Sequence, residues 1–310
     1  MRSRTNPRRR QLLYGLTAGV ATLLTLVGCA NPTDTATRTQ ETGPAPTVVE
    51  DPAVAAMVPA EVAGRGSLTV AVNPSSPPIK FLDGSGAITG FTPELLKAAA
   101  TVMGVDVEMQ QTSFDALIPG LESARFDLIL SINDVADRRA HTDFVDYLRT
   151  GTAMLASTSV AEDSLTPADL CGRSVGFVRG NVQQDLVAAA GEKCAVSGRP
   201  QPLGNGFGDI NAAILAVQSG QVELAWGDAP SISYNATENP TRYKLVYREV
   251  SGIYGMGVNN ARPELRDALQ AGLRKAVENG TYAHLLEKYG LTDYALPEMP
   301  INTGPADDNT

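Results

Sequence analysis

The chain has 310 residues, with 34 acidic and 25 basic side chains, and its formal net charge at pH 7 is −9. This charge argues against a nucleic-acid-binding protein and against attraction to anionic lipids. Residues 1–28 contain five arginines and no acidic residue, so their removal lowers the charge to −14.

The N-terminus has the pattern of an export signal. A basic segment, residues 1–11, precedes an apolar segment that ends at Cys29. The sequence Leu26-Val27-Gly28-Cys29 resembles a bacterial lipobox, which predicts a lipoprotein signal peptide over 1–28 and lipidation of Cys29. A retained transmembrane anchor is the alternative, but the apolar segment is short for a span. The pair Arg9-Arg10 leaves export by the general or by the twin-arginine route open.

The chain contains three cysteines, which is an odd number for an exported protein. Lipidation of Cys29 leaves Cys171 and Cys194. An oxidising compartment outside the cytoplasm permits these two to pair. Two buried free thiols are the alternative.

Two terminal segments lack sustained hydrophobic periodicity. Residues 29–63 are rich in Thr, Pro, Ala and Glu, and we expect them to form a disordered tether. We expect the same of the tail, residues 303–310. The roughly 240 residues between them are enough for two modest lobes or one large domain.

The first half of the folded part alternates strands and helices. Thr92 and Pro93 are expected to open a helix that Gly104 ends. The predicted strands cover 67–72, 105–109 and 125–131, and the predicted helices cover 93–103 and 113–123. This β-α-β-α-β order is typical of an open, largely parallel sheet.

The same alternation begins again in the second half. Asp209 is expected to cap a helix, and the glycine-rich residues 204–208 are interpreted as a loop because no strand is predicted before them. Predicted helices cover 166–170, 181–191, 210–219, 262–280 and 281–290, and predicted strands cover 174–178, 222–227, 243–250 and 252–259.

Two segments of the chain match each other. Residues 118–131 and 214–227 both have the pattern of a helix end, a tight turn, an acidic residue and an apolar strand. Arg138 follows the first strand closely, and Asp228 follows the second directly. Ligands of open α/β sheets bind beyond the carboxyl ends of strands. A cation and an anion placed there on two similar lobes would suit a zwitterionic ligand.

Several longer stretches resemble one family. They are GSLTVAVNPSSPPIKFLDGSGAITGFTPELLKAAA, FDALIPGLESARFDLILSINDVADRRAHTDFVDYL, DLCGRSVGFVRGN, INAAILAVQSGQVELAWGDAP and NGTYAHLLEKYGL. Together they resemble the bacterial extracellular solute-binding proteins, family 3, of ABC importers for polar amino acids, over about residues 66–302. The DLCG stretch with a later cysteine resembles one lipoprotein subgroup, which favours a Cys171–Cys194 disulfide.

The resemblance implies an α/β fold of the type II periplasmic-binding-protein class. Each of two lobes would be an open mixed sheet flanked by helices, with the ligand in the cleft. Lobe 1 would comprise residues 64–157 and 251–302, and lobe 2 residues 158–250. The chain would cross between the lobes near 156–160 and near 247–252.

The resemblance also implies roles for individual residues. Arg138 would bind the ligand α-carboxylate, Asp228 the α-ammonium group, and Phe114 would pack on the ligand side chain. Backbone N–H groups near Asn181 and Val182 would add to the carboxylate site at a helix N-terminus. Arg139 is interpreted as surface charge.

Other positions depart from the pattern of the family or leave alternatives open. Ser131 ends the predicted strand and Asn133 follows it into the predicted cleft, where Asn133 replaces the usual Ser or Thr. Asp134 replaces an apolar residue; it would either select an additional cationic group or, as we favour, point to solvent. Trp226 would either line the pocket or, as we favour, belong to the core.

The sequence therefore predicts the substrate-binding lipoprotein of an ABC importer. It would capture a small zwitterionic solute, a polar amino acid or a derivative, and deliver it to permease subunits. We expect a monomer without cofactor or metal, anchored to the outer face of the cytoplasmic membrane. An extracytoplasmic dehydratase-like enzyme, with His141 near the cleft, and a sensor for a membrane receptor are the alternatives.

Overall fold

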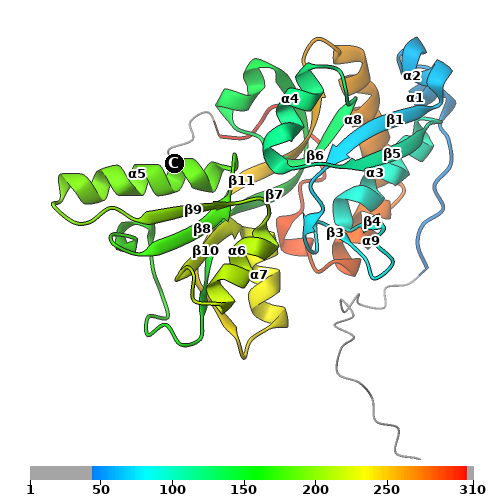
Figure 1. Ribbon diagram of the computed structural model, residues 1–310. Helices are drawn as coiled ribbons and strands as arrows, with labels where there is room; N and C mark the ends of the chain where they lie inside the picture. Colours follow the sequence, from blue (N-terminus) through cyan, green and yellow to red (C-terminus); the bar gives the residue numbers. More distant parts are fainter. Residues whose placement is uncertain (1–43, 306–310) are drawn as a thin grey trace, which may run out of the picture. The chain divides into compact units, whose positions relative to one another are not determined.

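The computed structural model describes residues 44–305, which contain a central mixed sheet (Figure 1). The strand order is β5-β1-β6-β11-β7-β10-β8-β9, and a small second sheet has the order β2-β3-β4. The strands are β1 (Ser67–Val72), β2 (Ser75–Ser76), β3 (Lys80–Leu82), β4 (Ile88–Thr89), β5 (Asp106–Gln111), β6 (Leu128–Asn133), β7 (Thr142–Ser157), β8 (Ser174–Val178), β9 (Leu203–Phe207), β10 (Leu224–Asp228) and β11 (Tyr243–Asn259).

Two long antiparallel strands, β7 and β11, form the middle of this sheet. Parallel strands flank them, with β6, β1 and β5 on one side and β10, β8 and β9 on the other. The expected separate sheets are therefore joined into one. The sequence did not predict β7, and it predicted β11 as two strands. The register of β11 against β7 shifts between Glu249 and Gly252, opposite Thr152 and Thr150.

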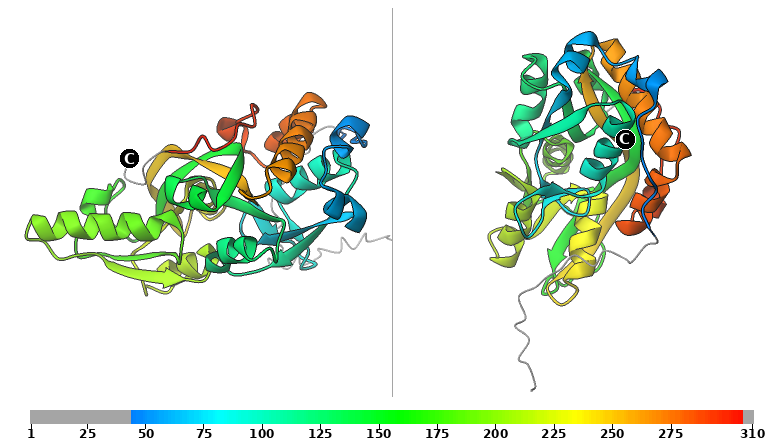
Figure 2. Two further views of the ribbon diagram at one scale, coloured as in Figure 1. Left: turned by 90° about the horizontal axis from the view of Figure 1, so that it is seen from above. Right: turned by 90° about the vertical axis from the view of Figure 1, so that its right-hand side faces the viewer.

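Helices cover both faces of the sheet. Figure 2 shows α8 and α9 on one face and α4 on the other. The α-helices are α1 (Pro52–Ala55), α2 (Ala60–Arg65), α3 (Phe91–Val102), α4 (Leu117–Glu122), α5 (Val182–Val196), α6 (Ile210–Gln218), α7 (Ala229–Glu238), α8 (Pro263–Glu278) and α9 (Thr281–Lys288), and the 3₁₀ helices are η1 (Phe114–Ala116), η2 (Ala136–Ala140), η3 (Pro167–Asp169) and η4 (Thr292–Tyr294). The sequence did not predict α7.

The predicted terminal disorder is wrong for the described parts of both segments. Residues 52–55 form α1 and residues 60–65 form α2, and Val54, Val58 and Val62 are buried in the core that α3 and α8 share. At the other end, the backbone N–H and the hydroxyl of Thr303 donate to the buried Asp146. The predicted signal peptide, Cys29, and the remainder of both terminal segments lie outside the described residues.

Local predictions fail where tertiary contacts determine the backbone. Thr92 does not cap α3, because its hydroxyl bonds with the Tyr147 hydroxyl at 2.8 Å. The helix begins instead after Gly90, whose φ is 119° and whose position would place a Cβ 2.6 Å from the carbonyl oxygen of Ile79. The predicted loop at 204–208 is wrong for residues 204–207, because these residues belong to β9 and pair in parallel with β8. Asp209 caps α6 as predicted, by accepting a bond from Ala212 N–H.

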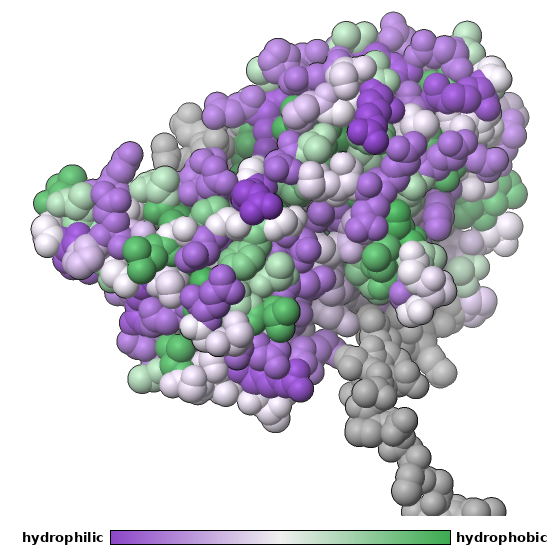
Figure 3. All heavy atoms as spheres, viewed as in Figure 1, coloured by the Kyte–Doolittle hydropathy of each residue, from purple (hydrophilic) through white to green (hydrophobic). Residues whose placement is uncertain are grey.

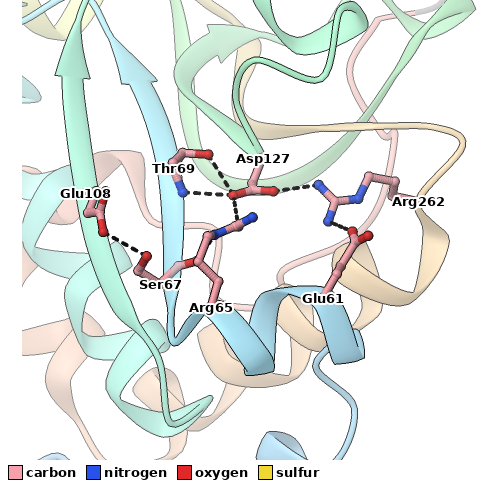
Figure 4. Close-up of polar contacts among 7 residues, drawn as sticks. All are labelled: Glu61, Arg65, Ser67, Thr69, Glu108, Asp127 and Arg262. Atoms are coloured by element: carbon pink, nitrogen blue, oxygen red, sulfur yellow. Dashed lines mark hydrogen bonds and ion pairs between the residues drawn. The ribbon is translucent and has the colours of Figure 1, made fainter.

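An ion-pair cluster fixes the start of β6 (Figure 4). The Asp127 carboxylate accepts hydrogen bonds from Arg65 at 2.5 Å, from Arg262 at 2.7 Å, and from the backbone N–H and hydroxyl of Thr69, both at 2.8 Å. Burial opposes ionisation of Asp127, but the hydrogen bonds from Arg262 and Thr69 and the charge of Arg65 outweigh it and lower the pKa of the carboxyl. The Arg262 guanidinium also pairs with Glu61.

The second half of the chain contains the predicted disulfide. Cys171 follows η3, Cys194 lies in α5, and their sulfur atoms are bonded. Residues 44–305 include no helix with the length and apolar character needed to cross a membrane. On the face drawn in Figure 3, polar side chains are interspersed with smaller apolar areas.

Candidate functional site

Residues from distant parts of the chain meet at the carboxyl ends of β6 and β10. Asn133 ends β6 and Asp228 ends β10, although β11 and β7 lie between these strands in the sheet. The Asn133 side-chain N–H group donates to Asp228 Oδ1 at 3.1 Å and to Asn181 Oδ1 at 3.2 Å. The structure therefore brings together three residues that the sequence placed in one cleft.

The Asp228 carboxylate is surrounded by neutral donors. Besides Asn133 and Asn181, it accepts hydrogen bonds from Gln183 Nε2 at 3.0 Å and from the Tyr254 hydroxyl at 2.5 Å. Sequence reasoning missed Gln183 and Tyr254. Gln183 could have been found as a polar residue of the first turn of α5, and Tyr254 as a polar aromatic in the apolar part of β11, residues 252–258.

Arg138 lies in η2, close to Phe114. Its guanidinium donates to the carbonyl oxygens of Asn133 and Gly180, both at 2.9 Å, and its central carbon lies 5.7 Å from the centre of the Phe114 ring. The planar guanidinium is thus held beside Phe114 by backbone carbonyl groups from two distant segments. Such a group forms bidentate hydrogen bonds with carboxylates.

The N-terminus of α5 is the predicted source of further N–H donors. The Asn181 N–H group donates to the Val178 carbonyl, and the Val182 N–H group donates to Asn181 Oδ1 at 3.0 Å. Both donors are therefore satisfied within this segment. The Val182 N–H group would bind a ligand only if the Asn181 side chain moved, and the Asn181 N–H group only if its bond to the Val178 carbonyl broke.

Lys80 is a buried cation that sequence reasoning missed. Its side chain enters from β3, the residue is 2% exposed, and Nζ donates to the Ser131 carbonyl oxygen at 2.9 Å. Burial lowers the pKa of Lys80 to about 8, while the nearby charge of Asp228 opposes this shift. The Nζ atom also lies 5.7 Å from the centre of the Tyr254 ring.

Ser131 shapes the backbone next to Lys80 through a set of buried hydroxyls. Its φ is 51°, and its hydroxyl donates to Thr92 Oγ1 and accepts from the Tyr147 hydroxyl, both at 3.0 Å. Burial raises the pKa of Tyr147 far above its usual range, so this hydroxyl stays protonated. The hydroxyl of Ser131 thus forms hydrogen bonds within the core, and the carbonyl oxygen of Ser131 accepts the hydrogen bond from Lys80.

A narrow cavity of about 10 Å³ remains between these groups. Its walls include Asn73, Lys80, Phe114, Asn181, Asp228 and Ser231. This volume holds about one water molecule, so a solute enters only if the cleft widens.

Asp134 and Arg139 have surroundings different from those expected, whereas Trp226 lies in the core, as we favoured. Asp134 does not point to solvent: it is 0% exposed and accepts hydrogen bonds from Arg139 Nε at 2.6 Å and from the Gly304 N–H group at 2.7 Å. Arg139 is correspondingly a partner of this buried carboxylate rather than plain surface charge. Trp226 is buried in the apolar cluster of β10 and α5, and it does not line the cavity that contains Asp228.

A second cavity of about 420 Å³ lies between α5 and the bulged part of β11. Its walls include Val182, Leu186, Trp226, Tyr247, Ile253 and Pro305. Neither His141 nor His284 lines this cavity or the narrow one. The narrow cavity, which combines Asp228, Lys80 and the neighbouring Arg138, is therefore the better candidate for capture of a small charged solute.

The fold and this cleft agree with comparisons to known proteins. Residues 68–292 match the bacterial extracellular solute-binding proteins, family 3, and the chain belongs to this family. The arginine-binding protein ArgT of Corynebacterium glutamicum is 27% identical over 263 residues, which cover 83% of this chain and 86% of ArgT. A probable histidine-binding protein of Campylobacter jejuni is 26% identical, over 73% of this chain and 85% of that protein.

Solved structures show the same relationship. An ancestral arginine-binding protein bound to arginine matches with a TM-score of 0.67 and 26% identity, over 73% of this chain and 98% of the other. The form bound to glutamine matches with a TM-score of 0.65 and 28% identity, over the same shares. The fold is thus the mixed α/β periplasmic-binding-protein fold, and the chain is a solute-binding protein rather than an enzyme.

Proposed function

We propose that this protein captures a free amino acid and delivers it to the permease of an ABC importer. One observation carries the proposal: Asp228 and the Phe114 ring line the same narrow cavity, and the Arg138 guanidinium lies against that ring. Arg138 would bind the α-carboxylate in a bidentate manner, and Asp228 would accept hydrogen bonds from the α-ammonium group. The relatives named for arginine and histidine binding, and the ancestral arginine-binding protein bound to glutamine, support an amino acid as the solute.

Binding would replace hydrogen bonds that now close the cleft. The ammonium group would take the place of neutral donors at Asp228, such as Asn133 and Gln183. The carboxylate would take the place of a carbonyl oxygen at Arg138. Each exchange replaces a neutral partner of Asp228 or Arg138 by an oppositely charged one, which strengthens the hydrogen bond and favours the ligand-bound state.

The test is a thermal-shift screen of the exported protein against the twenty amino acids, with sugars and amines as comparison. A true ligand raises the melting temperature by mass action. Replacing Arg138 or Asp228 by Ala should weaken binding by tens to thousands of fold, because a buried ligand charge left unpaired costs about 2–5 kcal/mol. The exposed Arg242 is the control, and Arg242→Ala should bind as the unmodified protein does. A sugar as the sole ligand would refute the proposal.

We propose that the cleft opens by a hinge between two lobes, residues 64–157 with 251–302, and residues 158–250. The support is the shift in register between Glu249 and Gly252, where the long strands β7 and β11 pass side by side. The crossing near 247–252 coincides with this shift, whereas the one near 156–160 lies at the end of β7. Small-angle scattering should show a more compact protein with saturating amino acid than without it, and equal envelopes would argue against a hinge.

Anchoring is also part of the proposal. The lipobox before Cys29 supports a lipoprotein on the outer face of the cytoplasmic membrane, where two acyl chains suffice for stable attachment. Cys29→Ala should release the protein from the membrane fraction or block its maturation. A Cys29→Ala protein of mature size that stays with the membrane would contradict lipidation.

A further inference from the structure

The buried lysine of the cleft has a consequence for the choice of solute. We propose that Lys80 binds an anionic group on the ligand side chain, so that the preferred solute is an amino acid with a second carboxylate. This inference rests on the proposed function, because it assigns Arg138 and Asp228 to the α-carboxylate and the α-ammonium group.

Lys80 has more N–H donors than it has hydrogen-bond partners among the described residues. A protonated lysine carries three N–H donors. Among the described residues, Nζ makes one hydrogen bond, to the Ser131 carbonyl oxygen at 2.9 Å. The remaining donors belong to a side chain in the wall of the narrow cavity, which also includes Asp228 and Phe114. A ligand that enters the widened cavity therefore meets a cation that is only partly satisfied.

Charge balance indicates that the ligand side chain carries a negative charge. An α-carboxylate at Arg138 and an α-ammonium group at Asp228 neutralise one protein charge each, and Lys80 is left over. Asp228 at present supplies the nearby negative charge, and a bound ammonium group would compete for it. A buried charge without a partner is strongly unfavourable, so a further negative charge on the ligand completes the site.

The same cavity contains a second group that needs an acceptor. The Ser231 side chain lines the cavity and is buried, with the residue 1% exposed, and its hydroxyl has no hydrogen-bond partner in the described part of the chain. Asn73 and Ser76 add polar surface to this wall. A carboxylate offers several acceptor sites, so it can satisfy Lys80 and Ser231 together.

Lys80 would repel a ligand whose side chain is cationic. The guanidinium of arginine would lie near the Lys80 ammonium group at low local dielectric, where like charges repel strongly. This chain is therefore expected to discriminate against arginine, despite its similarity to proteins named for arginine binding. Lys80 would act as a specificity residue.

The experiment measures Kd by calorimetry for L-glutamate, L-glutamine, L-aspartate, L-asparagine and L-arginine, with the protein purified as exported. Each acid and its amide have nearly the same shape and differ in charge. We expect at least one acid to bind ten or more times more tightly than its amide, and arginine to bind more weakly than that acid. In Lys80→Met the two members of the pair should bind within about threefold of each other, because the methionine side chain keeps the length and removes the charge.

Lys97 is the matched control, because it is exposed on α3, and Lys97→Met should keep the preference. If Lys80→Met does not fold, Lys80→Gln takes its place in the comparison. An amide or arginine that binds the unmodified protein as tightly as the acids would overturn the role of Lys80 and leave the proposed function intact. A preference for the acid over its amide that persists in Lys80→Met would also overturn the role of Lys80 and leave the proposed function intact. Binding of none of the five amino acids would refute the acidic-ligand proposal, and a blank result with all twenty would refute amino-acid capture as well.

Discussion

At the scale of single residues, buried charges divide into those that hold the fold and those that are available to a ligand. Asp127 belongs to the first kind, because two guanidinium groups and Thr69 satisfy its carboxylate. Lys80 belongs to the second, because the protein offers it one carbonyl oxygen. Both side chains are buried, so burial alone does not separate structural from functional charges. The number of hydrogen-bond partners within the protein separates them.

Asp127→Ala should reduce the free energy of unfolding by about 1–3 kcal/mol, because the Thr69 N–H and hydroxyl lose their acceptor and two guanidinium groups lose an ion pair. The matched control is Asp163→Ala: Asp163 also forms an ion pair, with Lys244 at 2.6 Å, but its side chain is 91% exposed. Such a surface pair contributes at most about 1 kcal/mol. Urea denaturation of both variants measures the difference, and equal losses would contradict the structural role of Asp127.

The sequence revealed the residues at strand ends better than those that tertiary packing brings in. Asn133, Arg138 and Asp228 could be predicted because they follow apolar strands, and strand ends meet in this class of sheet. Lys80 could not, because a lysine after two prolines has the pattern of an exposed turn. Its burial depends on the contact between β3 and the end of β6, which are far apart in the chain.

At the scale of elements, helix α5 packs against the rest of the fold through a narrow stripe of buried residues. Its buried residues lie along one face and are Gln183, Val187, Ala190, Gly191 and Cys194. The disulfide from Cys194 to Cys171 fastens this stripe to the segment that follows η3. Because the N-terminus of α5 carries Asn181 and Gln183, its position affects the cleft directly.

Replacing both Cys171 and Cys194 by Ser should lower the free energy of unfolding by about 3 kcal/mol, by the loop-entropy argument for a loop of this length. The two cysteines are separated by 23 positions. Urea denaturation measures the loss, and the unmodified protein with a reducing agent should lose a similar amount. If the unmodified protein is insensitive to the reducing agent, the bridge does not stabilise the fold.

Strands β9 and β7 show why some elements escaped prediction. Strand β9 contains two glycines, which are typical of loops, yet it forms because its backbone pairs in parallel with β8. Strand β7 carries acidic and basic residues through the middle of the sheet, and its buried Asp146 is tolerated because Thr303 donates to it. In both cases the deciding partner is distant in sequence, whereas α3 and α6 depend on local periodicity and were predicted.

At the scale of the whole molecule, the C-terminal segment closes the fold over two neighbouring carboxylates. Burial raises the pKa of Asp146 to about 7, the charge of Asp134 adds to the rise, and hydrogen bonds from Thr303 oppose it. The folded protein therefore holds a proton on Asp146 at a pH where the unfolded chain has lost it. Such a group stabilises the fold at low pH, and its contribution is lost as the pH rises towards about 7.

The melting temperature of the unmodified protein should accordingly fall between about pH 5 and about pH 7.5 by more than that of Asp146→Asn, which cannot ionise at this position. Groups that titrate elsewhere act on both proteins equally, so the difference isolates Asp146. Asp115, which is exposed, provides the control substitution Asp115→Asn, whose profile should match that of the unmodified protein. Parallel profiles for Asp146→Asn and the unmodified protein would show that Asp146 is ionised in the fold.

The contacts of Gly304 determine where the C-terminal boundary of an engineered form of the protein can be placed. A Cβ at this position would lie 1.9 Å from the carbonyl oxygen of Asp134, so glycine alone fits against that backbone. Its N–H group and that of Thr303 are donors to the two buried carboxylates. An expression boundary drawn at residue 302, where the predicted tail begins, would delete both donors. Affinity tags and fluorescent reporters are therefore best joined after residue 305, so that these last two links remain in the folded protein.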